Sequence, residues 1–265
     1  MIVRRLRLIA SALLCTGYAA VSAAGGFAAV VSPPRFELNS KAGTTVRQVF
    51  ELSNTAPEPA KFRVHTADFT LAQDYGVTFQ EVLQPGSCRP WVALERAEVS
   101  LPGSGTIRYR FEMQVPKDAP AGECRFAILI DGEASYMAKA GGMQLPVLGR
   151  IGIITYLRVG DAKPHIEIFG PDIVTVEGQK LPALRVHNDG DAHTRTSGFL
   201  SGRDATGKKY DFIPSDMPIL PGEERVVYFR PSTAEGTSPT LTFPVTVRGK
   251  LEWDDQSADL DEQFK

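Results

Sequence analysis

The sequence has little of what enzymes and metalloproteins depend on. It has 4 histidines and 3 cysteines among 265 residues, and none of them has the Cys/His spacing of a metal site. It contains no Gly-x-Ser-x-Gly motif, no phosphate-binding loop and no zinc-binding helix motif. The acidic residues are scattered and do not form a pair of catalytic carboxylates. We therefore expect no enzymatic activity, no metal and no cofactor.

The segment HNDGDAH, residues 187–193, comes closest to a metal site. Asp189 and Asp191 would supply oxygen ligands, and the flanking histidines would supply nitrogens. However, Asn-Asp-Gly between two alternating segments is also typical of a tight turn, because these residues tolerate left-handed backbone. The turn is the stronger interpretation.

The sequence also has no apolar run long enough to span a bilayer. The run at residues 8–14 is too short. It follows Arg4, Arg5 and Arg7 and precedes a series of small residues at 21–24, which is the order of a secretory signal peptide. We expect residues 1–24 to be a cleaved signal peptide, with cleavage as late as Ala28 as the limit. A retained anchor is the weaker interpretation. The expected location is the periplasm.

Loss of that segment removes three arginines and no acid, so the formal net charge changes from −2 to about −5. An acidic protein is a poor partner for nucleic acid. Cys88 and Cys124 are the cysteines that remain, in an oxidising compartment. A disulfide between them would close a loop of roughly 37 residues and contribute about 4 kcal/mol in the chain-entropy model. The alternative is two reduced thiols, one of them buried.

No long segment has helical periodicity. Alternating apolar and polar residues bounded by Gly, Pro, Asn and Asp predict strands throughout. The clearest strands lie at residues 46–54, 61–69 and 106–115, and the pattern restarts after a short polar link at 161–164. We expect an all-β protein of two tandem β-sandwiches, with domains at 25–160 and 161–253 and a frayed acidic tail at 254–265. Pro33 and Pro34 predict an edge strand or a change of sheet, because proline cannot donate to a ladder.

One apolar segment, residues 145–160, has a cation in its middle, Arg150. It follows a small-residue-rich segment at 132–143, which we interpret as a mobile loop. An exposed apolar edge strand recruits other chains and is normally blunted. This edge would be a hazard unless pairing with another chain is its function.

With these residues the chain resembles the periplasmic pilus-assembly chaperones of the chaperone–usher pathway. The resemblance covers residues 30–253 and rests on SPPRFELNSKAGTTVRQVFELSN, on a Leu-Pro-Gly before a strand, and on the apolar strand with its embedded base. It implies two immunoglobulin-like sandwiches in an L shape. It also implies that the protein caps fimbrial or pilus subunits by donating the last strand of its first domain, then passes them to an outer-membrane usher.

The resemblance further implies two basic anchors for the carboxylate at the subunit's C terminus, matched here by Arg35 and Arg150. The implied donor strand is Leu145, Val147, Leu148, Ile151 and Ile153. The spacing from Arg150 to Arg158 departs from the family pattern, so Arg158 could instead serve the domain interface.

Simpler interpretations remain for the two anchors and for the whole chain. Arg150 could be an outward-facing surface residue, and Arg35 could be an exposed partner of Glu37. The chain as a whole could be a tandem immunoglobulin-like module that binds the envelope or a matrix protein. The free protein could also cap its own edge as a homodimer.

Overall fold

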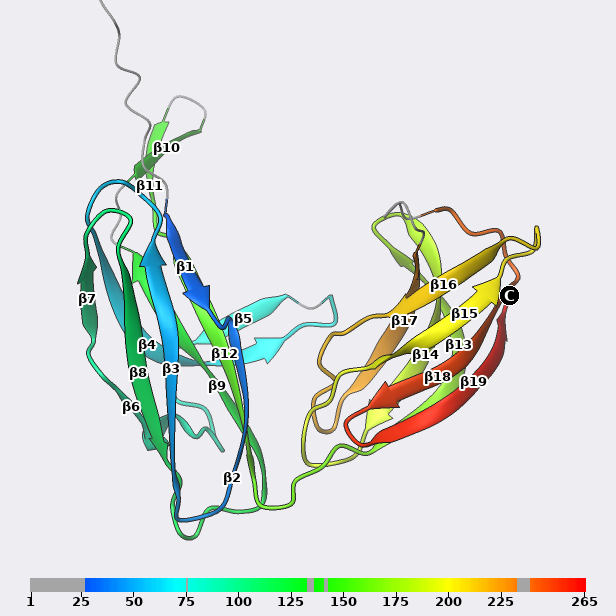
Figure 1. Ribbon diagram of the computed structural model, residues 1–265, viewed down its shortest axis with the longest axis horizontal. Helices are drawn as coiled ribbons and strands as arrows, with labels where there is room; N and C mark the ends of the chain where they lie inside the picture. Colours follow the sequence, from blue (N-terminus) through cyan, green and yellow to red (C-terminus); the bar gives the residue numbers. More distant parts are fainter. Residues whose placement is uncertain (1–26, 75, 133–135, 141–142, 233–238) are drawn as a thin grey trace, which may run out of the picture.

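The computed structural model describes residues 27–74, 76–132, 136–140, 143–232 and 239–265. It consists of two β-sandwiches joined by a short linker and set at an open angle to each other (Figure 1). Domain 1 contains strands β1 to β12, and domain 2 contains β13 to β19. The described residues include no helix long and apolar enough to cross a membrane.

Domain 1 packs two sheets face to face. The first sheet, in spatial order, is β1 (Ala29–Ser32), β3 (Thr45–Asn54), β8 (Thr106–Gln114) and β6 (Val92–Leu94). The second is β2 (Arg35–Ser40), β12 (Arg150–Val159), β9 (Gly122–Gly132), β4 (Ala60–Leu71) and β5 (Val77–Gln80), with β7 (Glu98–Leu101) also beside β4. A single turn of 3₁₀ helix, η1 (Arg89–Trp91), precedes β6.

The alternation in the sequence sets which face of each strand is buried. In β8, Tyr109, Phe111 and Met113 point into the core, and the residues between them point outward. Tyr109 stacks on Phe50 of the neighbouring strand with 4.9 Å between the ring centroids. Strand β9 is apolar on both faces, because it lies in the middle of its sheet and its outer face is covered as well.

The two prolines mark a change of sheet, as predicted. Strand β1 pairs with β3 in the first sheet, and the chain then crosses at Pro33-Pro34 to form β2 in the second sheet. Strand β2 runs parallel to β12 and pairs with it only from Ile154 onward. Because β2 begins only after this crossing, it pairs with β12 from Ile154 onward and leaves the residues before Ile154 without a strand on that side.

Domain 2 is one continuous run of seven strands that wraps around a single core. In spatial order the strands are β13 (Ile166–Val176), β14 (Gln179–Asn188), β17 (Glu224–Ser232), β16 (Lys209–Pro214), β15 (Ser197–Arg203), β18 (Val245–Trp253) and β19 (Gln256–Phe264). The core is built from side chains such as Phe212, Phe229 and Val247.

Two sequence predictions are wrong here. The tail at 254–265 does not fray: residues 256–264 form β19, which pairs with β18 and buries Leu260 and Phe264 while Asp259 and Asp261 point outward. The segment 145–160 is not one strand either. Its first part belongs to β11 (Met143–Val147), which forms a hairpin with β10 (Tyr136–Ala140) where we expected a mobile loop. Strand β12 begins only at Arg150.

Candidate functional site at the edge of β12 and the interdomain cleft

The first part of β12, from Arg150 to Ile153, has a partner strand on one side only. Arg150 to Ile153 pair with β9, whereas β2 begins to pair at Ile154. Gly149 directs its carbonyl to β9, where it accepts from Gly132 at 3.0 Å, and Ile154 donates in the opposite direction, to Pro34 at 3.3 Å. Because hydrogen-bonding directions alternate along a strand, the main-chain groups of Arg150 and Gly152 point away from β9. Among the described strands, none pairs with this edge.

Glycines allow neighbouring aromatic rings to pack tightly around this edge. A Cβ at Gly149 would lie 1.8 Å from Cγ of Phe27, and a Cβ at Gly152 would lie 2.5 Å from Cζ of Phe79. Phe27 also packs edge-on against Phe62, with 6.2 Å between the centroids. The edge is therefore bounded by two aromatic side chains.

Arg150 is 37% exposed and already has anionic partners. Its Nε donates to Asp131 at 2.6 Å, and its Nη2 lies 3.3 Å from Glu81. Asp131 also accepts from Arg63 at 3.0 Å and is 2.9 Å from His65. Burial raises the pKa of Asp131, but the hydrogen bonds from Arg150, Arg63 and His65 outweigh it and lower that pKa to about 2. Asp131, and to a lesser degree Glu81, in turn raise the pKa of Arg150 against the effect of burial.

Arg35 lies at a different place from Arg150. It is opposite Ile154, four residues farther along β12, which corresponds to about 13 Å. Its Nε is 2.8 Å from Glu37, as the simpler interpretation of Arg35 had it. In this structure the two predicted anchors do not converge on one point.

The predicted donor residues have different environments. Leu148 is 67% exposed and Ile151 is half-buried. Ile153 is fully buried because it shares the inward face of β12 with Leu157, so its side chain is not exposed to a partner in this conformation. The side chains of Leu145 and Val147 lie outside the described residues.

Polar residues from both domains meet at the base of the cleft. His193 of domain 2 is 3% exposed at its side chain, and its Nδ1 lies 2.6 Å from Oε2 of the fully buried Glu123 on β9. The His193 ring stacks on Tyr156 with 3.8 Å between the centroids. Arg158 donates to the His193 carbonyl at 2.7 Å and pairs with Asp254 at 3.0 Å. Arg158 is therefore a residue of the domain interface.

Burial and the surrounding charges shift the pKa values of this group. His193 lowers the pKa of Glu37 most, burial opposes that shift, and Arg35 and Arg195 add to it, which leaves the value at about 2. Burial lowers the pKa of His193, but Glu123 and Glu37 outweigh it and raise the pKa above its ordinary value. Burial raises the pKa of Tyr156 to about 12. At neutral pH, Glu37 is therefore an anion in contact with cations.

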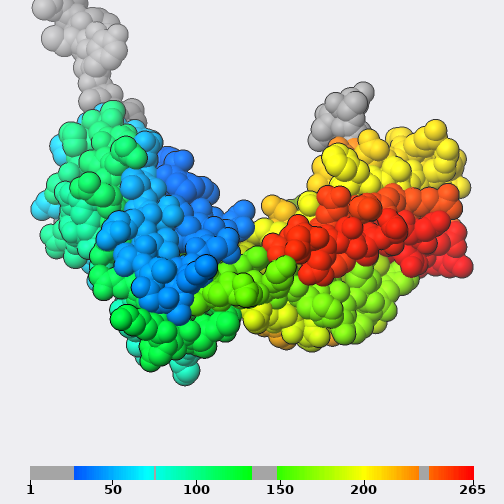
Figure 2. Space-filling model, turned by 60° about the horizontal axis from the view of Figure 1, so that its bottom comes forward, coloured from blue at the N-terminus to red at the C-terminus, as the bar shows by residue number. Residues whose placement is uncertain are grey.

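A second contact between the domains lies at the end of the β4–β5 hairpin, which reaches toward domain 2 in Figure 1. Arg225 on β17 is 2% exposed and donates to the carbonyls of Ala72 and Leu71 at 2.6 and 3.2 Å. Leu220 of domain 2 belongs to the same buried cluster as Phe69 and Tyr156 of domain 1. In Figure 2 the domains touch near the linker and leave an open notch between them.

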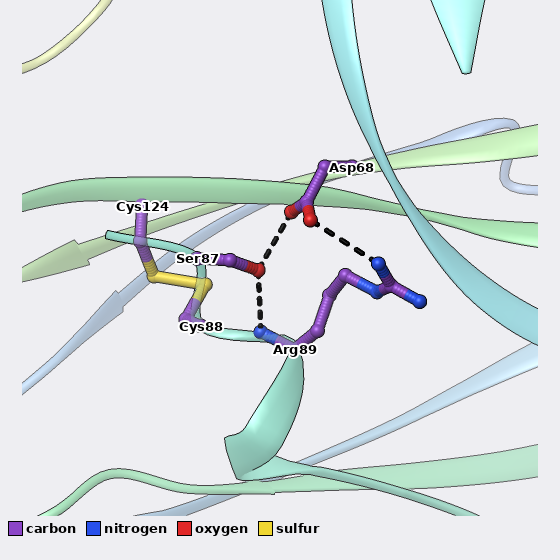
Figure 3. Close-up of a disulfide and its surroundings, with 5 residues drawn as sticks. All are labelled: Asp68, Ser87, Cys88, Arg89 and Cys124. Atoms are coloured by element: carbon purple, nitrogen blue, oxygen red, sulfur yellow. Dashed lines mark hydrogen bonds and ion pairs between the residues drawn. A yellow bond between two sulfur atoms is a disulfide. The ribbon is translucent and has the colours of Figure 1, made fainter. Parts of the chain in front are cut away.

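Cys88 and Cys124 form the predicted disulfide, which joins the segment before η1 to β9 (Figure 3). Beside it, Asp68 on β4 accepts from Ser87 Oγ at 2.6 Å and from Arg89 at 3.2 Å. The amide of Arg89 donates back to Ser87 Oγ at 3.2 Å. These bonds fasten the segment to two strands of the cleft-facing sheet.

The segment at 187–193 forms the predicted turn. Asn188 Oδ1 accepts from the amides of Gly190 and His165, both at 3.1 Å, and Asp191 accepts from the amide of Lys163 at 2.7 Å. Asp189 pairs with His165 instead of with the other residues of the turn. Potential ligand atoms of His165, Asp189 and Glu167 lie within 4.8 Å of one another, but all three residues are exposed. Asp189 and Asp191, which the sequence suggested as metal ligands, therefore have different partners in this structure.

Several residues of the cleft were not found by sequence reasoning. Glu37, Glu123 and Arg195 come from separate strands and loops of two domains. Their only sequence signal is a charge in an otherwise strand-like segment, which is common on exposed faces.

No family model and no curated protein matches this chain. The solved structures similar to it include many fimbrial chaperones. The YadV chaperone has 14% sequence identity, with 89% of this chain and 99% of that chain covered and a TM-score of 0.46. The CupB2 chaperone of Pseudomonas aeruginosa has 11% identity, coverage of 89% and 100%, and a TM-score of 0.46. The CsuC–CsuE chaperone–tip adhesion subunit complex of Acinetobacter baumannii has 12% identity, coverage of 88% and 97%, and a TM-score of 0.46. Structural similarity at these sequence identities and TM-scores does not show the function of this chain.

Proposed function

We propose that the protein is a periplasmic chaperone for fimbrial or pilus subunits, which it caps through the free edge of β12 and then passes to an outer-membrane usher. It works by strand addition, with no cofactor and no catalytic step. The observation that carries the proposal is the edge at Arg150 to Ile153, whose outward main-chain groups have no partner strand in the described part of the chain.

Strand addition uses these groups directly. An incoming strand bonds to the outward amides and carbonyls, and its side chains are selected by pockets on alternate positions. Leu148 and Ile151, with Leu145 and Val147 before them, are the apolar side chains that this edge would offer a subunit. An unprotected apolar edge is normally selected against, which supports pairing with another chain as its purpose.

The predicted anchors take separate roles in this proposal. Arg35 is 42% exposed at its side chain and stands where the free edge ends, so it is placed for a terminal carboxylate. Arg150 would first have to exchange Asp131 for a subunit group, because its guanidinium is already in an ion pair. The free protein could also pair edge to edge with a second copy.

The test is native mass spectrometry of the protein purified gently from the periplasm of its own host. A small subunit at one-to-one stoichiometry is the expected result. Arg150→Pro removes one outward N–H from the edge, and Arg150→Gln is its matched control, which keeps the N–H and loses only the charge. We expect Arg150→Pro to lose the subunit and Arg150→Gln to keep it, while the two variants share the same modest loss of melting temperature, because both remove the ion pair with Asp131. Undiminished capture by Arg150→Pro would refute strand addition, and a client-free protein in cells that are making pili would favour the binding module.

A further inference from the structure

Two short segments of domain 2 have the same pattern and face each other across a strand pair. His-Ile-Glu at residues 165–167 and His-Asn-Asp at residues 187–189 each place an acid two residues after a histidine. Because side chains alternate along a strand, the histidine and the acid of each segment share a face. Strands β13 and β14 are antiparallel and pair Glu167 with His187, and the same register places His165 opposite Asp189. Each histidine therefore faces an acid of the other strand.

The potential ligand atoms of this group already lie close together. Those of His165, Glu167 and Asp189 are within 4.8 Å of one another. Nδ1 of His165 contacts the carboxylate of Asp189 directly. Ligand atoms around one zinc ion lie about 3–4 Å apart, because each bond to the metal is about 2 Å long. Small side-chain rotations are therefore enough to bring the ligands around one ion.

We infer that His165, Glu167, His187 and Asp189 form a binding site for a divalent transition metal, zinc in the first place. Two imidazole nitrogens and two carboxylate oxygens make a four-ligand set that suits zinc, whereas calcium and magnesium prefer oxygen ligands alone. The inference does not depend on the proposed function. It departs from the expectation of no metal, which rested on spacing along the sequence, because these ligands are assembled across two strands.

The main chain beneath the ligands is fixed in advance by the buried Asn188. Its Oδ1 accepts from the amide of His165 at 3.1 Å, and its Nδ2 donates to two main-chain carbonyls at 2.8 and 2.9 Å. The ring of His187 stacks on Phe169 with 6.3 Å between the centroids. Ligands that are held by rigid strands and oriented by neighbouring side chains lose little freedom when a metal binds.

The charges around the site leave its acids for a metal. Among the described residues, no lysine or arginine forms an ion pair with Glu167, and the ion-pair partner of Asp189 is His165. Lys163, two residues before His165, pairs instead with Asp255 at 3.0 Å. A bound cation would therefore neutralise two carboxylates that have no basic side chain of their own.

The site lies where the linker enters domain 2. The amide of Asp189 donates to the carbonyl of His165 at 3.1 Å, and the amide of Asp191 donates to that of Lys163 at 3.0 Å. The carbonyl of Asp191 in turn accepts from the amide of Glu123 in domain 1 at 2.9 Å. A metal at this point would fasten the start of β13 to the turn that contacts domain 1.

The experiment uses the exported full chain, purified without a tag, freed of metal with a chelator and returned to neutral buffer. Zinc chloride is titrated in, and binding is followed by isothermal titration and by NMR of the histidine side chains. The sequence has 4 histidines, so each signal can be assigned. His65, beside Asp131, and His193, beside Glu123, are the internal controls.

We expect one zinc ion per chain, with the signals of His165 and His187 shifted and those of the other two histidines unchanged. Calcium chloride should shift neither. His165→Gln, His187→Gln and Glu167→Gln should each weaken zinc binding by about tenfold or more, since even the loss of an outer-shell partner costs about 10–100-fold. Glu177→Gln is the matched control, because Glu177 is an exposed acid in the turn of the same hairpin, 3.2 Å from Arg230. It should bind zinc as wild type does.

A response from only one of the two histidines, or from neither in excess zinc, would overturn the four-residue site. So would wild-type affinity in His187→Gln. An equal loss in Glu177→Gln would assign the binding to general surface charge and also refute the site. Because His165, Glu167 and Asp189 are exposed, the metal-free variants should melt as wild type does, which separates loss of binding from loss of folding.

Discussion

His193 of domain 2 stacks on Tyr156 of domain 1 with 3.8 Å between the ring centroids, and its Nδ1 lies 2.6 Å from Glu123. One imidazole thus contacts two residues of the partner domain at once. Because all three side chains are shielded from water, loss of one partner would leave a buried group poorly paired, which costs more than the loss of a surface ion pair.

His193→Ala should separate the unfolding of the two domains. The substitution removes the stacked ring and leaves the buried carboxylate of Glu123 with only the longer ion pair to Arg158, at 3.6 Å, which we expect to cost about 3 kcal/mol. Calorimetry should then resolve two transitions where wild type has more cooperative melting. His165→Ala is the control, since His165 is exposed and pairs with Asp189 on the far side of the turn. A single, unshifted transition in His193→Ala would contradict the role of this contact.

The domain contact should be strongest between about pH 4.5 and 6.5. The pKa of Glu37 falls from 4.5 to about 2 on folding, so its stabilisation is complete above 4.5 and is lost as the pH falls through 2. The pKa of His193 is raised above 6.5, so its stabilisation is complete below 6.5 and is lost as the pH rises through the raised value. Glu123 and Arg158 also face His193.

Melting temperatures measured from pH 2 to 9 test this profile. Glu37→Gln should flatten the acid limb and His193→Phe the alkaline limb, and each should also weaken the other limb, because Glu37 and His193 shift each other's pKa. If both variants kept the wild-type profile, other groups would have to account for it.

Reduction of the disulfide should destabilise domain 1 and disturb Arg150. The bond spans 36 residues, for which the chain-entropy model gives about 4 kcal/mol. It fixes the segment in which Arg89 donates to the carbonyl of Glu81, and Glu81 is an ion-pair partner of Arg150. Denaturant unfolding of wild type with and without reductant measures the effect. The double variant Cys88→Ala/Cys124→Ala should be as unstable as the reduced protein and insensitive to reductant.

The parts of the fold that follow from local chemistry could be predicted from the sequence. Pro33 and Pro34 indicated the change of sheet because proline has no amide hydrogen, and alternation assigned the buried face of β8. Strand β19 was missed because Leu260 and Phe264 are the main apolar residues in an acidic segment. The pairing with β18 that stabilises it is not visible in so weak a pattern.

The candidate site could be predicted only in part, for a different reason. The free edge of β12 is a property of one strand and the point at which its neighbour begins, and both left a signal in the sequence. The sequence carries no signal of which residue each charged side chain pairs with. Arg150 meets Asp131 through cross-strand pairing, and Arg35 shares Glu37 with Arg195 through the angle between two domains.

Gly149→Ala tests whether Phe27 is part of the mature domain. The new Cβ would lie 1.8 Å from Cγ of Phe27, so the ring must move, and we expect a loss of roughly 1–3 kcal/mol in unfolding free energy. Phe27→Ala should make the same Gly149→Ala substitution nearly neutral, which a double-mutant cycle measures directly. Cleavage after Ala24 retains Phe27, whereas cleavage after Ala28 removes it. A neutral Gly149→Ala in the exported protein, together with an N terminus found by mass spectrometry at residue 29, would show that the upper edge of β12 opens further once the protein is processed.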